Sequence, residues 1–168
     1  MVVEKIKESK IILLKDSREP KEKYNFFHYK DVFHIGGHPL IDNLNVGDYS
    51  LLSFENQLMI ERKTEADIVS SFIGGKKDAP LSRRKEFKAM WERTTQKFRY
   101  LMIEGKFINL IEQNYRSAFH PHSLLGSLMS WSIRYNFSFF FVDNEVEGMK
   151  AIYWLCKEFL RLKSKGEI

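Results

Sequence analysis

The sequence predicts an α/β protein in which a central mixed β-sheet is flanked by α-helices. Short apolar runs at 11–14, 100–103 and 137–142 have the length and composition of strands that are covered on both faces. Longer stretches at 81–97 and 145–162 repeat apolar residues at helical spacing, which indicates amphipathic helices. A chain of 168 residues is long enough to bury one such core without disulfides or a structural metal.

Composition narrows the class of protein. Hydrophobic residues make up 43% of the chain and aromatic residues 14%, so a folded globular protein is expected. The single cysteine, Cys156, excludes an internal disulfide and a cysteine-based zinc site, and its place on an apolar helix stripe favours packing over nucleophilic chemistry. No secretory signal or membrane-length apolar run is present. We therefore expect no membrane partner, with a cytoplasmic location in a prokaryotic or phage source and a nuclear one in a eukaryote.

The N-terminal part divides into an arm and a strand. Residues 1–10 are polar and rich in lysine and glutamate, so we expect an arm followed by one domain at 11–168. The strand at 11–14 is followed by Asp16, at a strand end where α/β sheets often expose functional groups. An aspartate here also suits a turn, and both interpretations stay open. Pro20 ends the element.

Two weaker elements follow before the centre of the chain. The stretch 21–29 is short and aromatic, which favours a helix, and 32–35 has the composition of a strand that Gly36 and Gly37 would end.

A β-hairpin is predicted next, with apolar strands at 50–54 and 58–62 and a turn at 55–57. This turn places Asp48, at the hairpin entrance, roughly opposite Lys63. Because side chains alternate along a strand, Glu61 and Lys63 share one face while Arg62 points away.

The hairpin therefore brings Asp48, Glu61 and Lys63 together at one end of one face. Two carboxylates held this close are unfavourable unless a cation lies between them. A hard divalent cation such as Mg²⁺, bound by oxygen ligands and water, meets that need.

Positive charge is concentrated just after the hairpin. Thr64 is a predicted N-cap for a helix at 65–72, in which Asp67 suits the first turn. A glycine-rich loop at 74–80 then leads into the helix at 81–97. From residue 76 to residue 99 there are nine basic and three acidic residues, although the net charge of the whole chain is only +5. This clustering indicates a polyanionic partner, or alternatively a solvated helix face. The predicted DNA-binding residues are Lys76, Lys77, Arg83, Arg84, Lys85 and Lys88.

The remaining elements complete the predicted sheet and its helices. Glu104, at the end of the strand at 100–103, is either a neighbour of the site or a strand-end cap. Helices are expected at 107–113 and 123–134, and small residues in the second one suggest close packing on the sheet. His120 and His122 invite a zinc interpretation, but no further ligand stands at the right spacing.

The central motif resembles a known nuclease motif. Gly47-Asp48-Tyr49 is followed by Glu61-Arg62-Lys63 and then Asp67, as in the XPF-type structure-specific endonucleases, a branch of the PD-(D/E)xK or restriction-endonuclease-like nucleases. The segments Asp16–Pro20 and Leu101–Gly105 also resemble motifs of that family, so the similarity spans about residues 11–142.

The resemblance implies a restriction-endonuclease-like core with its active site on the hairpin. It implies a Mg²⁺- or Mn²⁺-dependent endodeoxyribonuclease, structure-selective for flap, fork or junction DNA, with a role in DNA repair or recombination. Asp48 and Glu61 would be the metal ligands, aided by the Arg62 carbonyl, and Lys63 would act on the attacking water or the phosphate. The implied further carboxylate and supporting residues are Asp16, Arg18, Glu19, Arg62 and Asp67.

Several alternatives stay open at this stage. The chain could be a catalytically silent nuclease-like DNA-binding or dimerisation module, a Holliday-junction resolvase or a restriction-like nuclease. Either Arg83 or Arg84 could match the arginine that similar nucleases carry. No helix-hairpin-helix domain, which many such nucleases possess, follows the last predicted helix, so a DNA-structure preference does not transfer. A homodimer or heterodimer through the C-terminal helices is equally open.

Overall fold

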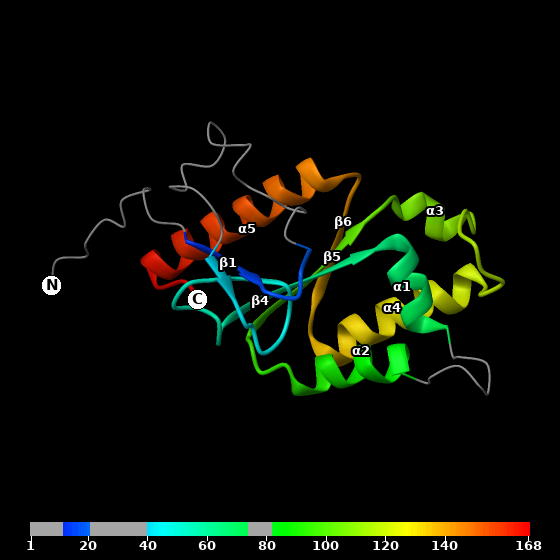
Figure 1. The fold of residues 1–168 in the computed structure, drawn as a ribbon, viewed down its shortest axis with the longest axis horizontal. Coiled ribbons are helices and arrows are strands. Elements are labelled where there is room, and N and C mark those ends of the chain that lie inside the picture. The colour runs from blue at the N-terminus through cyan, green and yellow to red at the C-terminus, as the bar shows by residue number, and fades with distance from the viewer. Residues whose placement is uncertain (1–11, 21–39, 74–81) are drawn as a thin grey trace, which may run out of the picture.

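Six strands form one mixed sheet in the computed structural model, which describes residues 12–20, 40–73 and 82–168 (Figure 1). The strands are β1 (Leu13–Asp16), β2 (Leu40–Asp42), β3 (Tyr49–Leu51), β4 (Leu58–Thr64), β5 (Phe98–Glu104) and β6 (Ser138–Val142). Their order across the sheet is β2-β1-β3-β4-β5-β6. β3 is antiparallel to both β1 and β4, whereas β1 with β2, and β4 with β5 and β6, run parallel. The predicted fold class is confirmed.

Helices cover both faces of this sheet. They are α1 (Glu65–Phe72), α2 (Ser82–Arg93), α3 (Phe107–Ile111), α4 (Pro121–Tyr135) and α5 (Glu145–Lys165). Figure 1 shows α5 on one side of the sheet and α1, α2 and α4 on the other. None of the helices within the described ranges is long and apolar enough to cross a membrane.

Strand β4 separates two hydrophobic cores because its side chains alternate between the faces. Leu58 and Ile60 pack into the core under α5, and Met59 packs with α1, α2 and α4. The predicted inward face of α5 is confirmed: the side chains of Met149, Ile152, Cys156 and Phe159 are buried, and that of Tyr153 is partly buried. Burial raises the pKa of the Cys156 thiol far above its usual value, which agrees with a packing role.

The hairpin exists, but its predicted register is wrong. The chain leaves β3 at Leu51 and re-enters at Leu58, so six residues form the connection instead of three. Ser53 adopts a left-handed conformation at φ 71°, and this turn ends the strand before Phe54. As a result Tyr49 pairs with Ile60, and Asp48 lies beside the chain at 60–62, not opposite Lys63.

Several boundaries also differ from the predicted ones. β2 was not predicted, because its three residues are too few to show a pattern. α2 ends at Arg93 instead of 97, where Thr94 turns its hydroxyl back to the carbonyl of Met90 at 2.8 Å. α4 begins at Pro121, with the ring of His120 accepting the backbone N–H of His122 as the N-cap.

The small residues of α4 do not pack on the sheet as expected. Leu124, Leu128 and Trp131 form its buried face, whereas Gly126 and Ser130 are exposed. A Cβ atom added at Gly126 would meet nothing within 4 Å. Bulky apolar side chains therefore anchor the helix, and its small side chains face outward.

Some predictions fall on residues outside the described ranges. These are the arm at 1–10, the helix at 21–29, the strand at 32–35, the loop at 74–80, and with it Lys76 and Lys77.

Candidate active site

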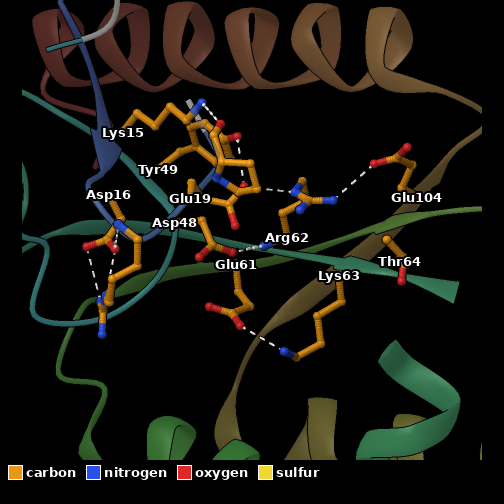
Figure 2. A network of polar contacts seen from close by, with 12 residues as sticks. Lys15, Asp16, Glu19, Asp48, Tyr49, Glu61, Arg62, Lys63, Thr64 and Glu104 are labelled. Carbon is orange, nitrogen blue, oxygen red and sulfur yellow. Dashed lines mark hydrogen bonds and ion pairs between the residues drawn. The ribbon is translucent and has the colours of Figure 1, made fainter. Parts of the chain in front are cut away.

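Alternation along β4 sets the directions of Glu61, Arg62 and Lys63, as predicted. Glu61 and Lys63 point to the face that α2 covers, and Arg62 points to the opposite face (Figure 2). The ammonium of Lys63 lies 3.2 Å from Glu61 Oε1 and 4.9 Å from the ring centroid of Phe87 on α2. An aromatic face and a carboxylate thus hold this lysine in place.

Asp48 enters the site through the backbone of β4. Its N–H donates to the carbonyl of Ile60 at 2.8 Å, and its Oδ2 accepts the backbone N–H of Arg62 at 2.6 Å. The preceding Gly47 has φ 77°, and a Cβ there would lie 2.7 Å from Met59 Cγ. Only glycine lets the chain approach β4 this closely, which explains the glycine of the Gly-Asp-Tyr motif.

Asp48 and Glu61 form an electrostatically unfavourable pair. Burial raises the pKa of Asp48 well above its usual value, and the negative charges of Glu61 and Glu19 raise it further. Burial likewise raises the pKa of Glu61, although the ammonium of Lys63 opposes the shift. Adding a cation beside the pair would favour the ionised form of both carboxyl groups.

Asp16 is not free to join this pair directly. Both of its oxygens are engaged: Oδ1 accepts the backbone N–H and Nε of Arg18, and Oδ2 accepts Nη2 of Arg18 and the backbone N–H of Leu44. Burial would raise the pKa of Asp16, but these hydrogen bonds outweigh it and hold the pKa below its usual value. Asp16 is linked to Asp48 through the main chain, where its N–H donates to the Asp48 carbonyl at 2.8 Å.

Arg18 connects Asp16 electrostatically to the pair. The hydrogen bond with Asp16 raises the pKa of the Arg18 guanidinium, and the charges of Asp48 and Glu61 raise it further. Arg18 therefore supplies positive charge near the carboxylates of Asp48 and Glu61, while its guanidinium group binds Asp16.

A second network lies on the opposite face of β4 and centres on Arg62. Its Nε donates to Glu19 Oε2 at 3.0 Å, and its Nη1 donates to Glu104 Oε2 at 3.1 Å (Figure 2). Tyr49 also donates its hydroxyl to Glu19, at 3.4 Å, and Lys15 donates to the carbonyl of Pro20 at 2.8 Å. Glu104 thus contacts a motif residue and is more than a cap of its strand.

Asp67 lies apart from these networks. Its carboxylate accepts the hydroxyl of Thr64 at 2.7 Å, and its backbone N–H donates to the same hydroxyl at 3.2 Å. Thr64 is therefore the N-cap predicted for α1. The resemblance makes an ion pair of Asp67 with Arg62 or with a basic neighbour reasonable, but Arg62 pairs with Glu19 and Glu104.

The predicted DNA-binding side chains of α2 are exposed near the site. Arg83 donates to Ser70 Oγ at 3.2 Å, and Arg84 lies 5.9 Å from the ring centroid of Trp131. Lys88 pairs with Glu92 at 3.2 Å, and Lys85 is exposed. Arg83 and Arg84 thus keep guanidinium groups over the same sheet face as Glu61 and Lys63.

The two carboxylates suit a hard divalent cation. Among the described residues, no three His, Cys, Asp or Glu side chains are grouped to hold a metal ion. Within the described ranges, the hydrogen bond of Asp48 with the Arg62 N–H uses Oδ2 and the ion pair of Glu61 with Lys63 uses Oε1, which leaves Asp48 Oδ1 and Glu61 Oε2 for an ion. Mg²⁺ commonly binds one or two protein carboxylates and completes its shell with water and substrate phosphate. The donor set therefore fits such an ion.

Sequence reasoning missed two members of the Arg62 network. Lys15 is a buried lysine that directly follows the apolar residues of β1, and Tyr49 belongs to the motif but was given no role. A lysine directly after an apolar strand could have indicated a nearby acidic or carbonyl partner, because a lysine is rarely buried without one.

Comparisons with known proteins identify the fold and the family. Two solved structures share the fold. One is XPF from Aeropyrum pernix, with a TM-score of 0.64 and 19% identity over 92% of this chain. The other is XPF of the same organism in complex with DNA, with a TM-score of 0.67 and 16% identity over 90% of this chain. This chain covers 68% and 66% of the length of those two chains. At these identities the likeness establishes the fold alone. No curated protein matches the chain.

The family model for the ERCC4 domain matches residues 16–155. The matched segment begins at Asp16 and includes Asp48, Glu61 and Lys63 together with the first half of α5. Because the match covers most of the sequence, this chain belongs to the ERCC4 domain family.

Proposed function

We propose that this protein is a metal-dependent DNA endonuclease that hydrolyses phosphodiester bonds. The observation that carries the proposal is the Asp48–Glu61 carboxylate pair with Lys63 at 3.2 Å from Glu61, inside an ERCC4 domain. The raised pKa values of both carboxyl groups indicate a site arranged to receive positive charge.

Asp48 and Glu61 are the residues that would hold Mg²⁺ or Mn²⁺, with the carbonyl of Arg62 as a further ligand by resemblance. Such an ion, when bound, lowers the pKa of a coordinated water and neutralises charge on the scissile phosphate. Asp16 would contribute through a water or after release from Arg18, because both of its oxygens are engaged.

The side chains around the pair have separate tasks in this proposal. Lys63 donates hydrogen bonds to the attacking water or to the phosphate oxygens as charge develops there. Glu61 and Phe87 keep its ammonium in place. Arg62 positions Asp48 through its backbone N–H, while its side chain fixes the strand against Glu19 and Glu104.

DNA is the proposed substrate, and α2 is its proposed first contact. The exposed cations Arg83, Arg84, Lys85 and Lys88 offer phosphate contacts beside the site. One of the matched Aeropyrum pernix structures is a complex with DNA, which supports DNA as the partner here. Selectivity for flap, fork or junction DNA, a role in repair or recombination, and a dimer through the C-terminal helices belong to the same proposal.

The decisive test is cleavage of labelled single-stranded, duplex, flap, fork and four-way junction DNA with Mg²⁺ or Mn²⁺. The wild type is compared with Asp48→Asn, Lys63→Met and the control Asp143→Asn, which changes an exposed aspartate of the loop after β6. Metal-dependent cutting that is lost in the first two variants and kept in the control supports the proposal. If Asp48→Asn still cuts, the assignment of the active site is wrong. If the wild type binds DNA but does not cut it, the protein is a catalytically silent DNA-binding module.

A further inference from the structure

An open hollow of about 490 Å³ lies between α2 and α4, outside the carboxylate site. It is lined by Arg84 from α2 and by residues of α4 that include His122, Gly126, Ser127, Ser130 and Arg134. We name this feature the α2–α4 hollow. Its floor is open because Gly126 has no side chain and nothing else fills the space beside it.

The charge of the α2–α4 hollow is wholly basic. Its lining contains two arginines and a histidine but no acidic residue, and α4 itself carries no aspartate or glutamate. Within the described part of the chain, neither Arg84 nor Arg134 forms an ion pair; Arg84 contacts the carbonyl of Phe72 at 3.4 Å and the ring of Trp131. Two guanidinium groups in one hollow repel each other, so an anion between them is favoured.

The hydroxyl groups suit the same ligand. Ser127 and Ser130 lie one turn apart on the lining face of α4 and can donate to oxygen acceptors. Guanidinium forks with serine hydroxyls are a common protein environment for phosphate. Trp131 also borders the hollow but is only 6% exposed, so it offers no stacking platform for a base.

The length of the α2–α4 hollow favours a strand over a single phosphate. His122 and Arg134 are twelve residues apart on one helix, which corresponds to about 18 Å. That span matches roughly five phosphates of one strand along a duplex axis, at ~3.4 Å each. A free phosphate would fill only a small part of it.

The hollow is also connected to the candidate active site. Phe87 lies under both: its ring centroid is 4.9 Å from Lys63 Nζ and 5.7 Å from the ring centroid of Trp131. The hollow is lined by α2 and α4, and Lys63 contacts Phe87 of α2. Both features therefore belong to the side of the sheet on which Figure 1 shows α1, α2 and α4. Arg84 of the hollow stands three residues before Phe87 on α2, so the two features are neighbours on this side of the sheet.

We propose that the α2–α4 hollow binds backbone phosphates of the DNA strand a few nucleotides away from the cleavage position. The inference rests on the proposed function for its ligand, and it assigns α4 to DNA binding in addition to the cations of α2. Contacts of this kind position a strand without reading its sequence.

The test measures the affinity of the whole chain for labelled single-stranded and duplex oligonucleotides by fluorescence anisotropy, in EDTA and at several salt concentrations. Arg134→Gln should weaken binding about equally for all sequences and reduce the slope of log K against log salt by about 1. Gly126→Glu should weaken binding by at least about tenfold, because it places a carboxylate on the open floor. Ile133→Glu is the matched control: it adds the same charge to α4 at an 83% exposed position outside the lining, and binding should change less than about twofold.

Three results would overturn the proposal. They are equal weakening by Gly126→Glu and Ile133→Glu, an unchanged salt slope in Arg134→Gln, and a wild type that binds neither oligonucleotide at low salt. Thermal stabilisation by inorganic phosphate that is lost in Arg134→Gln, with DNA binding unaffected, would assign the hollow to a free anion instead. If Gly126→Glu fails to fold, the affinity and salt slope of Arg134→Gln are compared with those of the wild type instead.

Cleavage by the same proteins separates this inference from the proposed function. If the hollow variants bind DNA more weakly but the wild type does not cut in Mg²⁺ or Mn²⁺, the hollow is a DNA-binding site and the nuclease proposal fails. If the wild type cuts with metal but the hollow variants bind DNA normally, the nuclease proposal stands and the DNA-binding role of the hollow fails.

Discussion

The backbone N–H of Arg62 donates to Asp48 Oδ2 at 2.6 Å, while the side chain of Arg62 crosses to the opposite face of the sheet. One residue therefore fixes the position of a candidate ligand and also anchors its strand to Glu19 and Glu104. The carboxylate site lies on one face of the sheet, and the ion network that supports it lies on the other. Changes at the site should therefore reduce activity most, and changes in the network should reduce stability most.

Asp48→Asn should separate stability from function. The amide keeps an oxygen that can accept the Arg62 N–H but removes the repulsion with Glu61. In EDTA we expect the free energy of unfolding to rise by about 0.5–2 kcal/mol. With Mg²⁺ or Mn²⁺ present, cleavage should fall by at least about 100-fold, because Asp48 is a proposed ligand of the ion. Adding Mg²⁺ or Mn²⁺ should raise the melting temperature of the wild type and leave that of the variant unchanged. A variant less stable than the wild type in EDTA would contradict the repulsion.

The same pair predicts how stability depends on pH without metal. The folded-state pKa values of Asp48 and Glu61 lie above their usual values of 3.8 and 4.5, so the folded protein takes up protons before the unfolded chain does. Stability should therefore increase as pH falls through the raised pKa values, an increase that is complete below the usual values. Melting curves in EDTA from about pH 8 to about pH 5 measure this, and Asp48→Asn should flatten the trend.

Asp16 predicts the opposite trend at lower pH. Its folded-state pKa lies below the usual 3.8, so its contribution is present above that pH and is lost as pH falls through the folded-state pKa. Asp16→Asn should lower the free energy of unfolding at neutral pH by about 2–3 kcal/mol, because the amide nitrogen cannot accept the hydrogen bonds of Arg18 and Leu44. Denaturant melts at neutral and acid pH compare the two proteins. Equal stability at neutral pH would show that these hydrogen bonds contribute little.

Arg62→Lys should destabilise the fold although it keeps the charge. The guanidinium reaches Glu19 with Nε and Glu104 with Nη1, and its side chain is only 9% exposed. An ammonium cannot span both carboxylates with the same geometry, so we expect a loss of about 1–3 kcal/mol in urea melts. Glu104→Gln is the milder control, because this carboxylate is 21% exposed and its partner keeps Glu19. A larger loss of stability from Glu104→Gln than from Arg62→Lys would contradict the central place of Arg62 in this network.

Two glycine substitutions should change stability in opposite directions. Gly126→Ala adds a methyl group to open space in an exposed helix and should stabilise by about 0.5–1 kcal/mol. Gly47→Ala places a Cβ at 2.7 Å from Met59 Cγ with φ at 77°, and should cost about 1–3 kcal/mol. Thermal melts measure both. Stabilisation by Gly47→Ala would show that the approach to β4 does not need glycine.

Local patterns in the sequence predicted most elements and part of the site. The apolar runs indicated β1, β5 and β6, and strand alternation alone put Glu61 and Lys63 on one face with Arg62 on the other. Thr64 was recognised as the N-cap of α1 from its position before the helix. These features depend on residues within a few positions of one another, so the sequence contains all that they need.

Contacts between distant segments decided the rest. The left-handed turn at Ser53 moved the hairpin register and placed Asp48 beside the Arg62 N–H. The approach of Leu44 and the guanidinium of Arg18 engage Asp16, for which the sequence had left both a site role and a turn role open. Which face of α4 packs inward was likewise set by the bulky residues that fit the sheet. By itself the sequence determined the types of element, the motif and the faces along β4. The distant partners, such as Glu19 and Glu104 for the side chain of Arg62, came only from the tertiary structure, because register and packing bring together residues that no local pattern relates.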